Sequence, residues 1–598
     1  MMLRLSELKL PLEALPSPER VSSDASTEAD LLTDHPIAAL RTEAARLLGI
    51  EAGAIETLTV YKRSIDARGA RLQAVYIVDV SLAPGCTLTP TQARHRWHHA
   101  RPAPDMRFVP QGHAKRAPTR RPVVVGMGPC GLFAALLLAE LGWQPLVLER
   151  GKPVRERTRD TWDLWRRHTL HAESNVQFGE GGAGTFSDGK LYSQIRDPQW
   201  LGRHVLTTLV EAGAPSEILW QAHPHIGTFR LVKVVEQLRA RIQALGGEVR
   251  FEHKLEALEL TPETDGHASV RGLLTRDQRT GTVETVQTGH VILALGHSAR
   301  DTFAALWDQG VALIPKPFSV GARVEHPQSQ IDAVRWGRHA GLTVLGAADY
   351  RLVHHAANGR GVYSFCMCPG GTVVAATSEP GRVVTNGMSQ YSRQERNANA
   401  ALVVGLDPTD FPRDATAFHH AFDAEAATRY QRQAQALWAQ GQAHPLAGIA
   451  LQRQLESAAY QAGGANYCAP AQLVGDFLQG CPSTAVGSVV PSYQPGVTWT
   501  DLTPLLPDYV VIALRQALPN FARSLRGFDR ADAVLTGLET RTSSPLRLPR
   551  DEQTLQSLST RGLYPAGEGA GYAGGILSAA VDGLRVAQAL ALELAAQT

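Results

Sequence analysis

The chain has 598 residues, of which 44% are hydrophobic and 19% charged, proportions typical of a globular protein with several domains. Its formal net charge of +2 gives no overall attraction to nucleic acid or to an anionic membrane, and no run of about 18 apolar residues predicts a membrane-spanning helix. Six cysteines in so long a chain, together with an N-terminus that lacks the features of a signal peptide, indicate reduced thiols and a cytoplasmic location.

The N-terminal region, residues 1–110, is predicted to form a small α/β domain followed by a basic linker. Helical spacing covers residues 35–48, and alternating patterns over residues 54–62 and 72–82 predict strands. The basic residues of the segment 84–121 are Arg94, Arg96, Arg101, Arg107, Lys115, Arg116, Arg120 and Arg121. The near-neutral chain favours a solvated linker here, and a site for RNA or another anionic partner is the alternative.

The next segment, residues 122–150, contains a strand, a glycine-rich turn, a helix and a second strand that ends in an acid. Gly126 permits a sharp turn, Gly128 lets the backbone approach a pyrophosphate, and Gly131 lets the helix pack against the strand. The N-terminus of the helix offers free N–H groups to the phosphates. Glu149 follows at about the 20-residue spacing of an acid that binds ribose hydroxyls. A dinucleotide site is therefore predicted, with an unliganded glycine turn as the alternative.

Further elements are predicted between this motif and the C-terminus. Helices are expected over residues 229–245, 424–440 and 509–521, and strands over 248–251, 255–258 and 290–296, with a hairpin formed by 270–274 and 282–286. The pattern becomes irregular from about residue 301 to residue 480, which is typical of an inserted domain without a nucleotide motif.

A second glycine-rich turn lies near the C-terminus, within residues 562–576, where an apolar strand runs into a glycine turn and then a helix. Its spacing differs from that of the first motif, and it suits the other end of the same extended cofactor. Glu568 is expected to hold ribityl hydroxyls, and the N–H groups near Gly574 and Gly575 to face a flavin ring. The helix dipole would then stabilise the anionic reduced flavin.

These motifs resemble those of FAD-binding oxidoreductases of the glutathione-reductase-like superfamily. The chain as a whole resembles a largely uncharacterised family of bacterial FAD-dependent dehydrogenases, through residues 176–191, 224–228, 316–327 and 366–371. The resemblance implies an α/β fold with an FAD/NAD(P)-binding Rossmann-like domain, an inserted substrate (cap) domain and a small N-terminal α/β domain. The implied boundaries are residues 1–110 for the N-terminal domain and linker, 118–305 for the first part of the FAD-binding domain, 306–485 for the insert, and 486–598 for the C-terminal part.

The resemblance also implies a set of FAD-binding residues. The ADP half is expected against the first turn and the main chain at Leu255, and the flavin half against residues 181–190 and the C-terminal turn. A purely structural glycine loop is the alternative for residues 181–190. The implied residues are Gly126, Gly128, Pro129, Gly131, Glu149, Arg150, Gly181, Gly182, Ser187, Asp188, Lys190, Leu255, Gly296, Gly567, Glu568, Gly574, Gly575 and Ile576.

The candidate catalytic residues are Cys366, Cys368, His326, Lys316 and Arg323. The two cysteines are two positions apart and so share one face of a strand; they either form a redox pair with the flavin or pack beside the Pro-Gly-Gly turn. Arg323 or Lys316 would hold an anionic substrate, and His326 would act as a general acid or base. Ordinary structural hydrogen bonding is the alternative for each of them. No metal site is predicted.

The sequence thus predicts an FAD-dependent oxidoreductase that transfers a hydride between the flavin and an unidentified small organic substrate. No second nucleotide motif is present, so NAD(P)H is expected only as a transient electron donor docked over the flavin. Two alternatives stay open: a flavin-dependent RNA-modifying enzyme, which the basic linker would support, and an interaction protein with a structural FAD. A stable complex with nucleic acid is not expected.

Overall fold

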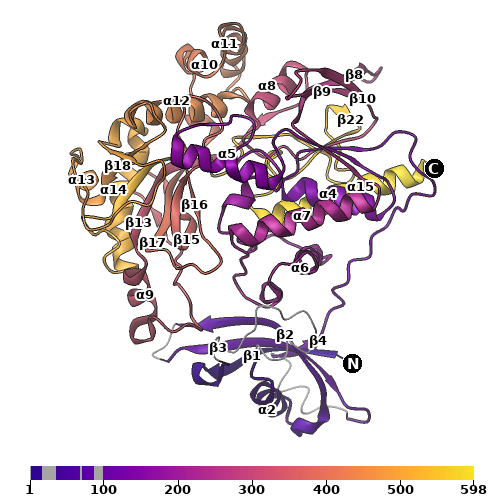
Figure 1. Ribbon diagram of the computed structural model, residues 1–598, viewed down its shortest axis with the longest axis vertical. Coiled ribbons are helices and arrows are strands. Elements are labelled where there is room, and N and C mark those ends of the chain that lie inside the picture. The colour runs from indigo at the N-terminus through magenta and orange to yellow at the C-terminus, as the bar shows by residue number, and fades with distance from the viewer. Residues whose placement is uncertain (1, 17–34, 68–70, 87–98, 598) are drawn as a thin grey trace.

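The computed structural model describes residues 2–16, 35–67, 71–86 and 99–597 (Figure 1). The predictions for Arg94 and Arg96 lie outside these residues. In the part of the chain that is described, no helix is both long and apolar enough to span a membrane. The molecule has three regions: an N-terminal sheet at the bottom of Figure 1, a parallel sheet with helices, and a large, mainly antiparallel sheet beside it.

The N-terminal domain is a four-stranded antiparallel sheet in the order β2-β3-β1-β4 with one packed helix. Its elements are β1 (Met2–Pro11), α2 (Ile37–Leu48), β2 (Ile55–Asp66), β3 (Gln73–Leu82) and β4 (Ala100–Pro102). The predicted helix and two strands are confirmed. The strand β1 was not predicted from the sequence, although Leu3, Leu5, Leu8 and Leu10 are all buried in the core of this domain.

The central region is a five-stranded sheet, β23-β11-β5-β6-β7, in which every pair is parallel. Its strands are β5 (Val123–Val125), β6 (Leu146–Glu149), β7 (Glu248–Phe251), β11 (Val291–Leu293) and β23 (Leu563–Pro565). Alternate side chains of β5 face opposite layers: Val124 packs with the helices, whereas Val123 and Val125 join the core shared with the large sheet. The predicted α/β class is confirmed.

Helices cover one face of the parallel sheet, where α4, α7 and α15 lie side by side (Figure 1). The helices of this region are α4 (Pro129–Glu140), α5 (Val154–Arg167), α6 (Leu201–Glu211), α7 (Thr228–Ala244), α8 (Arg300–Asp308) and α15 (Ile576–Ala596). Every residue of α4 from Cys130 to Ala139 is buried, because the helix is enclosed by the sheet on one side and by α7 and α15 on the other.

A second small sheet flanks the parallel one and contains the predicted hairpin. Its strands are β8 (His253–Pro262), β9 (Ala268–Asp277), β10 (Val283–Gln287) and β22 (Thr560–Arg561). The antiparallel register of β9 and β10 pairs Val283 with Arg276, so the predicted hairpin is confirmed. Two short strands, β12 (Ile314–Pro315) and β21 (Leu546–Arg547), pair nearby.

The third region is an eight-stranded sheet, β14-β15-β17-β13-β20-β18-β19, with β16 added to β15. Its strands are β13 (Phe318–Pro327), β14 (Val353–His355), β15 (Gly361–Ala375), β16 (Thr385–Met388), β17 (Asn397–Leu406), β18 (Ala469–Leu473), β19 (Val497–Trp499) and β20 (Val534–Glu539). Its helices are α9 (Gln328–Trp336), α10 (Ala415–Ala421), α11 (Ala424–Trp438), α12 (Ala447–Ala462), α13 (Val474–Gln479) and α14 (Asp508–Ser524). Because β19 and β20 belong to this sheet, the region continues past residue 485, where the sequence analysis places its end.

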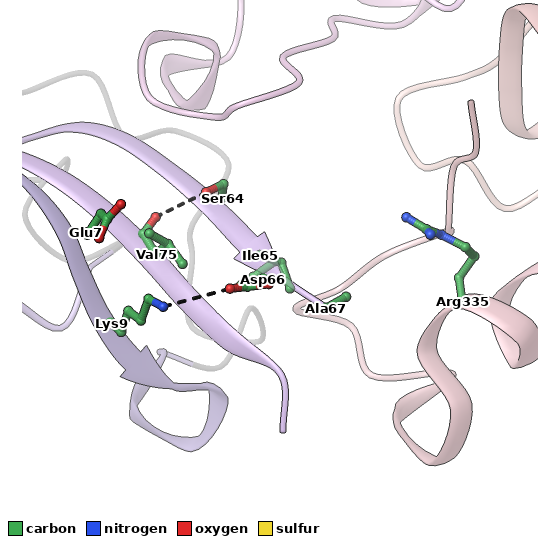
Figure 2. A pocket seen from close by; sticks show the side chains of 8 residues that line it. All are labelled: Glu7, Lys9, Ser64, Ile65, Asp66, Ala67, Val75 and Arg335. Carbon is green, nitrogen blue, oxygen red and sulfur yellow. Dashed lines mark hydrogen bonds and ion pairs between the residues drawn. The ribbon is translucent and has the colours of Figure 1, made fainter. Parts of the chain in front are cut away.

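The N-terminal sheet and the large region face each other across a small hollow (Figure 2). Lys9 of β1 and Asp66 of β2 lie on one side, with the lysine Nζ 4.0 Å from an Asp66 carboxylate oxygen. Arg335 of α9 lies on the other side. The lining of this hollow includes charged residues from both sides, which contrasts with the apolar core that joins the parallel sheet to the large sheet.

Candidate functional site

A deep cavity lies between the carboxyl edge of the parallel sheet and the large antiparallel sheet. Ligands of open parallel sheets bind at this edge, because the loops that leave the strands diverge there. Of the residues predicted to bind the cofactor, those that line the cavity are Gly126, Gly128, Pro129, Glu149, Arg150, Gly182, Ser187, Asp188, Lys190, Leu255, Gly296, Glu568, Gly574, Gly575 and Ile576. Gly131, Gly181 and Gly567 are not among its lining residues.

The first glycine turn connects β5 to α4 and leaves the start of the helix open. No side chain caps the helix at Gly128, and Pro129 occupies its first turn. A Cβ atom added to Gly128 would meet only the Cα of Gly182, at 3.6 Å, whereas one on Gly131 would overlap the carbonyl oxygen of Gly126. The turn therefore fits a pyrophosphate: Gly128 leaves room at the cavity wall, and Gly131 provides the close packing of helix on strand.

Glu149 holds the loops around this turn together. One carboxylate oxygen accepts hydrogen bonds from the backbone N–H groups of Gly151, at 2.8 Å, and Gly179, at 2.9 Å. The other accepts a hydrogen bond from the N–H of Met127 at 2.8 Å. The buried carboxylate thus positions three segments of the cavity wall, a role that spacing alone did not suggest. Its predicted contact with ribose hydroxyls stays a prediction.

Arg157 of α5 supports the second loop and was not selected from the sequence. Its fully buried guanidinium donates hydrogen bonds to the carbonyl oxygens of Asn175 and Val176, both at 2.7 Å, and of Gly182 at 2.9 Å. Burial lowers the pKa of this arginine to about 10. The side chain lies in an ordinary charged helix with no motif around it, so no local signal in the sequence would have identified it.

The C-terminal turn brings the start of α15 to the cavity, where Ile576 of α15 and Pro129 of α4 both lie close to Gly184. No side chain caps α15 at Gly575, and the N–H of Gly574 donates to Ser578 Oγ at 3.1 Å. Glu568 and His297 face each other across the lining, with Oε1 and Nδ1 3.3 Å apart. The sequence analysis did not select His297, although it directly follows the glycine that ends the β11 segment.

Charged groups gather where the loop 182–190 meets β15. The Nζ of Lys190 lies 3.5 Å from an Asp188 carboxylate oxygen and donates a hydrogen bond to the carbonyl oxygen of Met367. Asp188 also pairs with Arg393 at 2.5 Å. Burial alone would raise the pKa of Asp188, but Lys190 and Arg393 lower it overall. Burial, with a smaller contribution from Arg393, lowers the pKa of nearby His225 to about 4.

The candidate catalytic residues are only partly brought together. Cys366 lines the cavity, and Cys368 is buried next to it. Arg323 is fully buried; its guanidinium lies 2.9 Å from Glu539 Oε1 and donates to Asn399 Oδ1 at 2.8 Å. The guanidinium of Arg323 is thus already bonded to Glu539 and Asn399 inside the protein. Its contacts are therefore structural, and it is not free to bind an anionic substrate.

His326 and Lys316 lie outside the cavity lining. His326 is fully buried at the end of β13, where its Nε2 lies 2.7 Å from the carbonyl oxygen of Phe528. Burial lowers the pKa of His326 to about 4. The Nζ of Lys316 lies 3.3 Å from the carbonyl oxygen of Pro317 and 3.5 Å from Ser543 Oγ. Neither side chain is placed to contact a ligand bound in this cavity.

Comparison with known proteins agrees with this division of the chain. A family model described as "FAD-dependent protein, C-terminal domain-like" matches residues 317–542, which contain the whole eight-stranded sheet. A model described as "Domain of unknown function (DUF8436)" matches residues 2–81. An "Uncharacterized protein" of Clostridium beijerinckii is 46% identical over 469 residues, which are 78% of this chain and 80% of the relative. The two proteins belong to one family.

Three solved structures show weaker likenesses to this family member. L-amino acid deaminase from Proteus vulgaris is 11% identical, with 81% of this chain and 96% of that chain covered and a TM-score of 0.32. Glycerol-3-phosphate dehydrogenase from Bacillus halodurans, complexed with FAD, is 12% identical, with 49% of each chain covered and a TM-score of 0.25. THI4 of Thermovibrio ammonificans is 18% identical, with 33% of this chain and 63% of that chain covered and a TM-score of 0.23. The match therefore covers less than two thirds of the length of the glycerol-3-phosphate dehydrogenase and of THI4. Scores this low carry no argument about activity.

Proposed function

We propose that this protein is an FAD-dependent oxidoreductase that transfers a hydride between bound FAD and a small organic substrate. The observation that carries the proposal is a single cavity that both glycine turns line, at the uncapped N-termini of α4 and α15. A cofactor with a pyrophosphate in the middle and a ring system at one end can use both turns at once, since each helix N-terminus offers unpaired N–H groups.

The two ends of the cavity suit different parts of FAD. The turn at Gly128, with Leu255 of β8, would hold the ADP half, and the positive end of α4 would face the pyrophosphate. The loop 182–190 and the turn 574–576 would hold the flavin half. Bound FAD supplies the capacity to accept or donate two electrons as a hydride. The residues of the chain bind and orient this group and exclude water around it.

The family model for FAD-dependent proteins supports the cofactor assignment. The electron donor is a separate question. We propose NAD(P)H as a transient donor, because the chain has no second nucleotide motif for a resident one.

The first test is the visible absorption spectrum of the purified full chain, followed by anaerobic addition of NADH and of NADPH. A flavin spectrum that one nucleotide bleaches rapidly would support a nicotinamide-linked reductase. A flavin that neither nucleotide bleaches would favour a substrate-driven dehydrogenase or a structural flavin. A protein that binds no flavin even after FAD is added would contradict the central assignment.

We prefer a small-molecule substrate to RNA because acids partly neutralise the basic linker that follows the N-terminal domain. Two of its described basic residues are engaged with acids: Arg107 lies 2.7 Å from Asp105, and Arg121 lies 3.1 Å from Glu248. Such pairs reduce the net positive charge available to a phosphate backbone. Salt-dependent RNA binding that neutralisation of Arg116 and Arg120 abolishes would reverse this preference.

A further inference from the structure

We propose that Cys366 and Cys368 form a redox-active pair that exchanges two electrons with the bound flavin, and that the substrate class is a disulfide compound. The step that involves the flavin rests on the proposed function. The properties of the pair itself do not, because they follow from the geometry of β15 and its neighbours.

The pair occupies the wall of the cavity next to the segments assigned to the flavin. Cys366 lines the cavity together with Phe365, Lys190 and Asn386. Cys368 is fully buried, and its Sγ lies 3.3 Å from the carbonyl oxygen of Cys366. One thiol is thus reachable from the cavity and the second lies directly behind it. That is the arrangement needed for one sulfur to react with a ligand and the other to displace it.

The backbone at the pair is compressed. In the pairing of β15 with β17, the three steps from Phe365 to Cys368 lie opposite only the two steps from Ala401 to Asn399. Cys366 has a φ of 44°, in the left-handed region that few residues other than glycine adopt. A regular strand separates alternate Cα atoms by about 6.6 Å, close to the upper limit of about 6.8 Å for a disulfide. The bulge shortens this path, and strained residues of this kind concentrate at functional sites.

Cations converge on the peptide groups of the pair. Lys190 donates to the carbonyl oxygen of Met367, the residue between the two cysteines. From the other side, the guanidinium of Arg323 donates to the carbonyl oxygen of Cys366 at 3.2 Å. The neighbouring acids are already paired, Asp188 with Arg393 and Glu539 with Arg323.

This environment separates the two thiols chemically. A hydrogen bond from the Cys368 thiol, helped by Lys190 and Arg323, lowers the pKa of Cys366 although burial opposes it. The same hydrogen bond and burial raise the pKa of Cys368. A thiolate beside a protonated partner is the reactive form of a dithiol, because the thiolate is the attacking species in disulfide exchange.

The back of the pair is closed, which makes the reaction selective. A Cβ atom on Gly387 of β16 would overlap the guanidinium of Arg323 and lie 2.8 Å from the Sγ of Cys368. The Cys368 sulfur is thus enclosed on the side of β16, whereas Cys366 lines the cavity. Cys130 is buried within α4, and burial raises the pKa of its thiol, so the cysteine of the first glycine motif has the opposite character.

In the proposed reaction, the Cys366 thiolate attacks one sulfur of the substrate disulfide, which forms a mixed disulfide and releases the first thiolate. The Cys368 sulfur then attacks Cys366, which forms the internal disulfide and releases the second thiolate with the proton of Cys368. Regeneration breaks the Cys366–Cys368 bond and restores one thiolate and one thiol, with two electrons and one proton from the reduced flavin. A donor of the reduced nicotinamide class replenishes the flavin.

The pair is tested first without reference to flavin. The full chain is equilibrated with an excess of oxidised glutathione, quenched with iodoacetamide, and mapped by peptide mass spectrometry. We expect Cys366 and Cys368 to be linked to each other and protected from alkylation in the wild-type chain, and the remaining cysteine to be alkylated or joined to glutathione in C366S and C368S. The variant C468S, at a partly exposed cysteine outside the cavity, should keep the link. Full alkylation of both residues in the wild-type chain would overturn the proposal.

The electron count tests the connection to the flavin. The holoprotein is first oxidised as above and freed of the oxidant. Anaerobic dithionite titration is then expected to consume about four electrons per flavin in the wild type and about two in C366S, because each two-electron centre contributes separately. Two electrons in both proteins would overturn the exchange while the FAD assignment stands. A chain without flavin would contradict the proposed function, and the alkylation map would still decide whether the pair is redox-active.

Discussion

The two walls of the cavity are built on different principles. The wall from the parallel sheet uses glycine turns and helix N-termini, and the side chains that support it, Glu149 and Arg157, bond to backbone groups. The wall from the large sheet is backed by paired charges: Glu456 of α12 lies 2.9 Å from Arg300 of the adjoining α8 and 2.8 Å from Arg541, while Arg323 pairs with Glu539. Backbone contacts depend on local spacing, whereas ion networks depend on residues far apart in the chain. The first wall can therefore be recognised from sequence and the second cannot.

The largest expected effect is on the ion network of the second wall. Glu456→Gln leaves Arg300 and Arg541 without the carboxylate that both contact, and breaking a buried ion network costs about 3–5 kcal/mol. We expect a loss of that order in the free energy of unfolding, measured by urea denaturation. The matched control is Glu425→Gln on α11, whose side chain is 92% exposed and whose effect should stay within about 0.5 kcal/mol. Equal effects would contradict the contrast between the walls.

The same network predicts an acid-sensitive stability. Burial would raise the pKa of Glu456, but Arg300 and Arg541 lower it from 4.5 to about 2. Since the pKa is lower in the folded than in the unfolded chain, the stabilisation is complete above about pH 4.5 and is lost as the pH falls toward 2. Unfolding free energies of the wild type should fall by a few kcal/mol across this window. Those of Glu456→Gln should fall less, and parallel curves would contradict the assignment.

The first wall is tested by two neighbouring glycines with opposite roles. Gly128→Val places side-chain atoms where the pyrophosphate is expected, and its Cβ meets only an ordinary contact within the protein, so we expect a folded chain with at least about tenfold weaker FAD binding (~1.4 kcal/mol). Gly131→Val overlaps the backbone of Gly126 and should lower the melting temperature instead. Flavin absorbance per chain and thermal melting distinguish them.

Gly53→Ala is the control for both glycine variants, because a Cβ there meets nothing within 4 Å. It should leave flavin content and melting temperature unchanged. A Gly128→Val protein that retains its full flavin absorbance would remove the first motif from the cofactor site.

The smallest expected effect concerns the contact between the walls. Lys190 lowers the pKa of Cys366, so Lys190→Gln should raise that pKa and reduce the thiolate fraction near neutral pH. We expect the alkylation rate of Cys366 at pH 7 to fall by less than about tenfold, since Arg323 and the Cys368 thiol remain. Peptide mass spectrometry of a timed iodoacetamide reaction measures the rate. An unchanged rate would show that Lys190 does not act on the thiol.

The success of the sequence predictions also differs between local motifs and contacts that join distant parts of the chain. The residues of the two glycine turns gather in one cavity because their spacing directly encodes strand, turn and helix. Arg157 and His297 were missed because their roles arise only when distant loops meet. On β13 the sequence selected Arg323 and His326, yet nearly every residue of this central strand is buried. A strand covered on both faces gives no periodic signal to separate a cavity-facing side chain from one in the core.

The ion pair between Asp188 and Arg393 has a mechanical consequence. Asp188 belongs to the loop of the parallel region, and Arg393 lies between β16 and β17 of the large sheet, so the pair fastens the two walls together near the thiols. The Lys190 bond to Met367 is a second fastening a few residues away. Any opening of the molecule at this point must break two charge-assisted bonds at once. Small molecules that enter the cavity by a rearrangement of side chains at its rim do not require these two bonds to break.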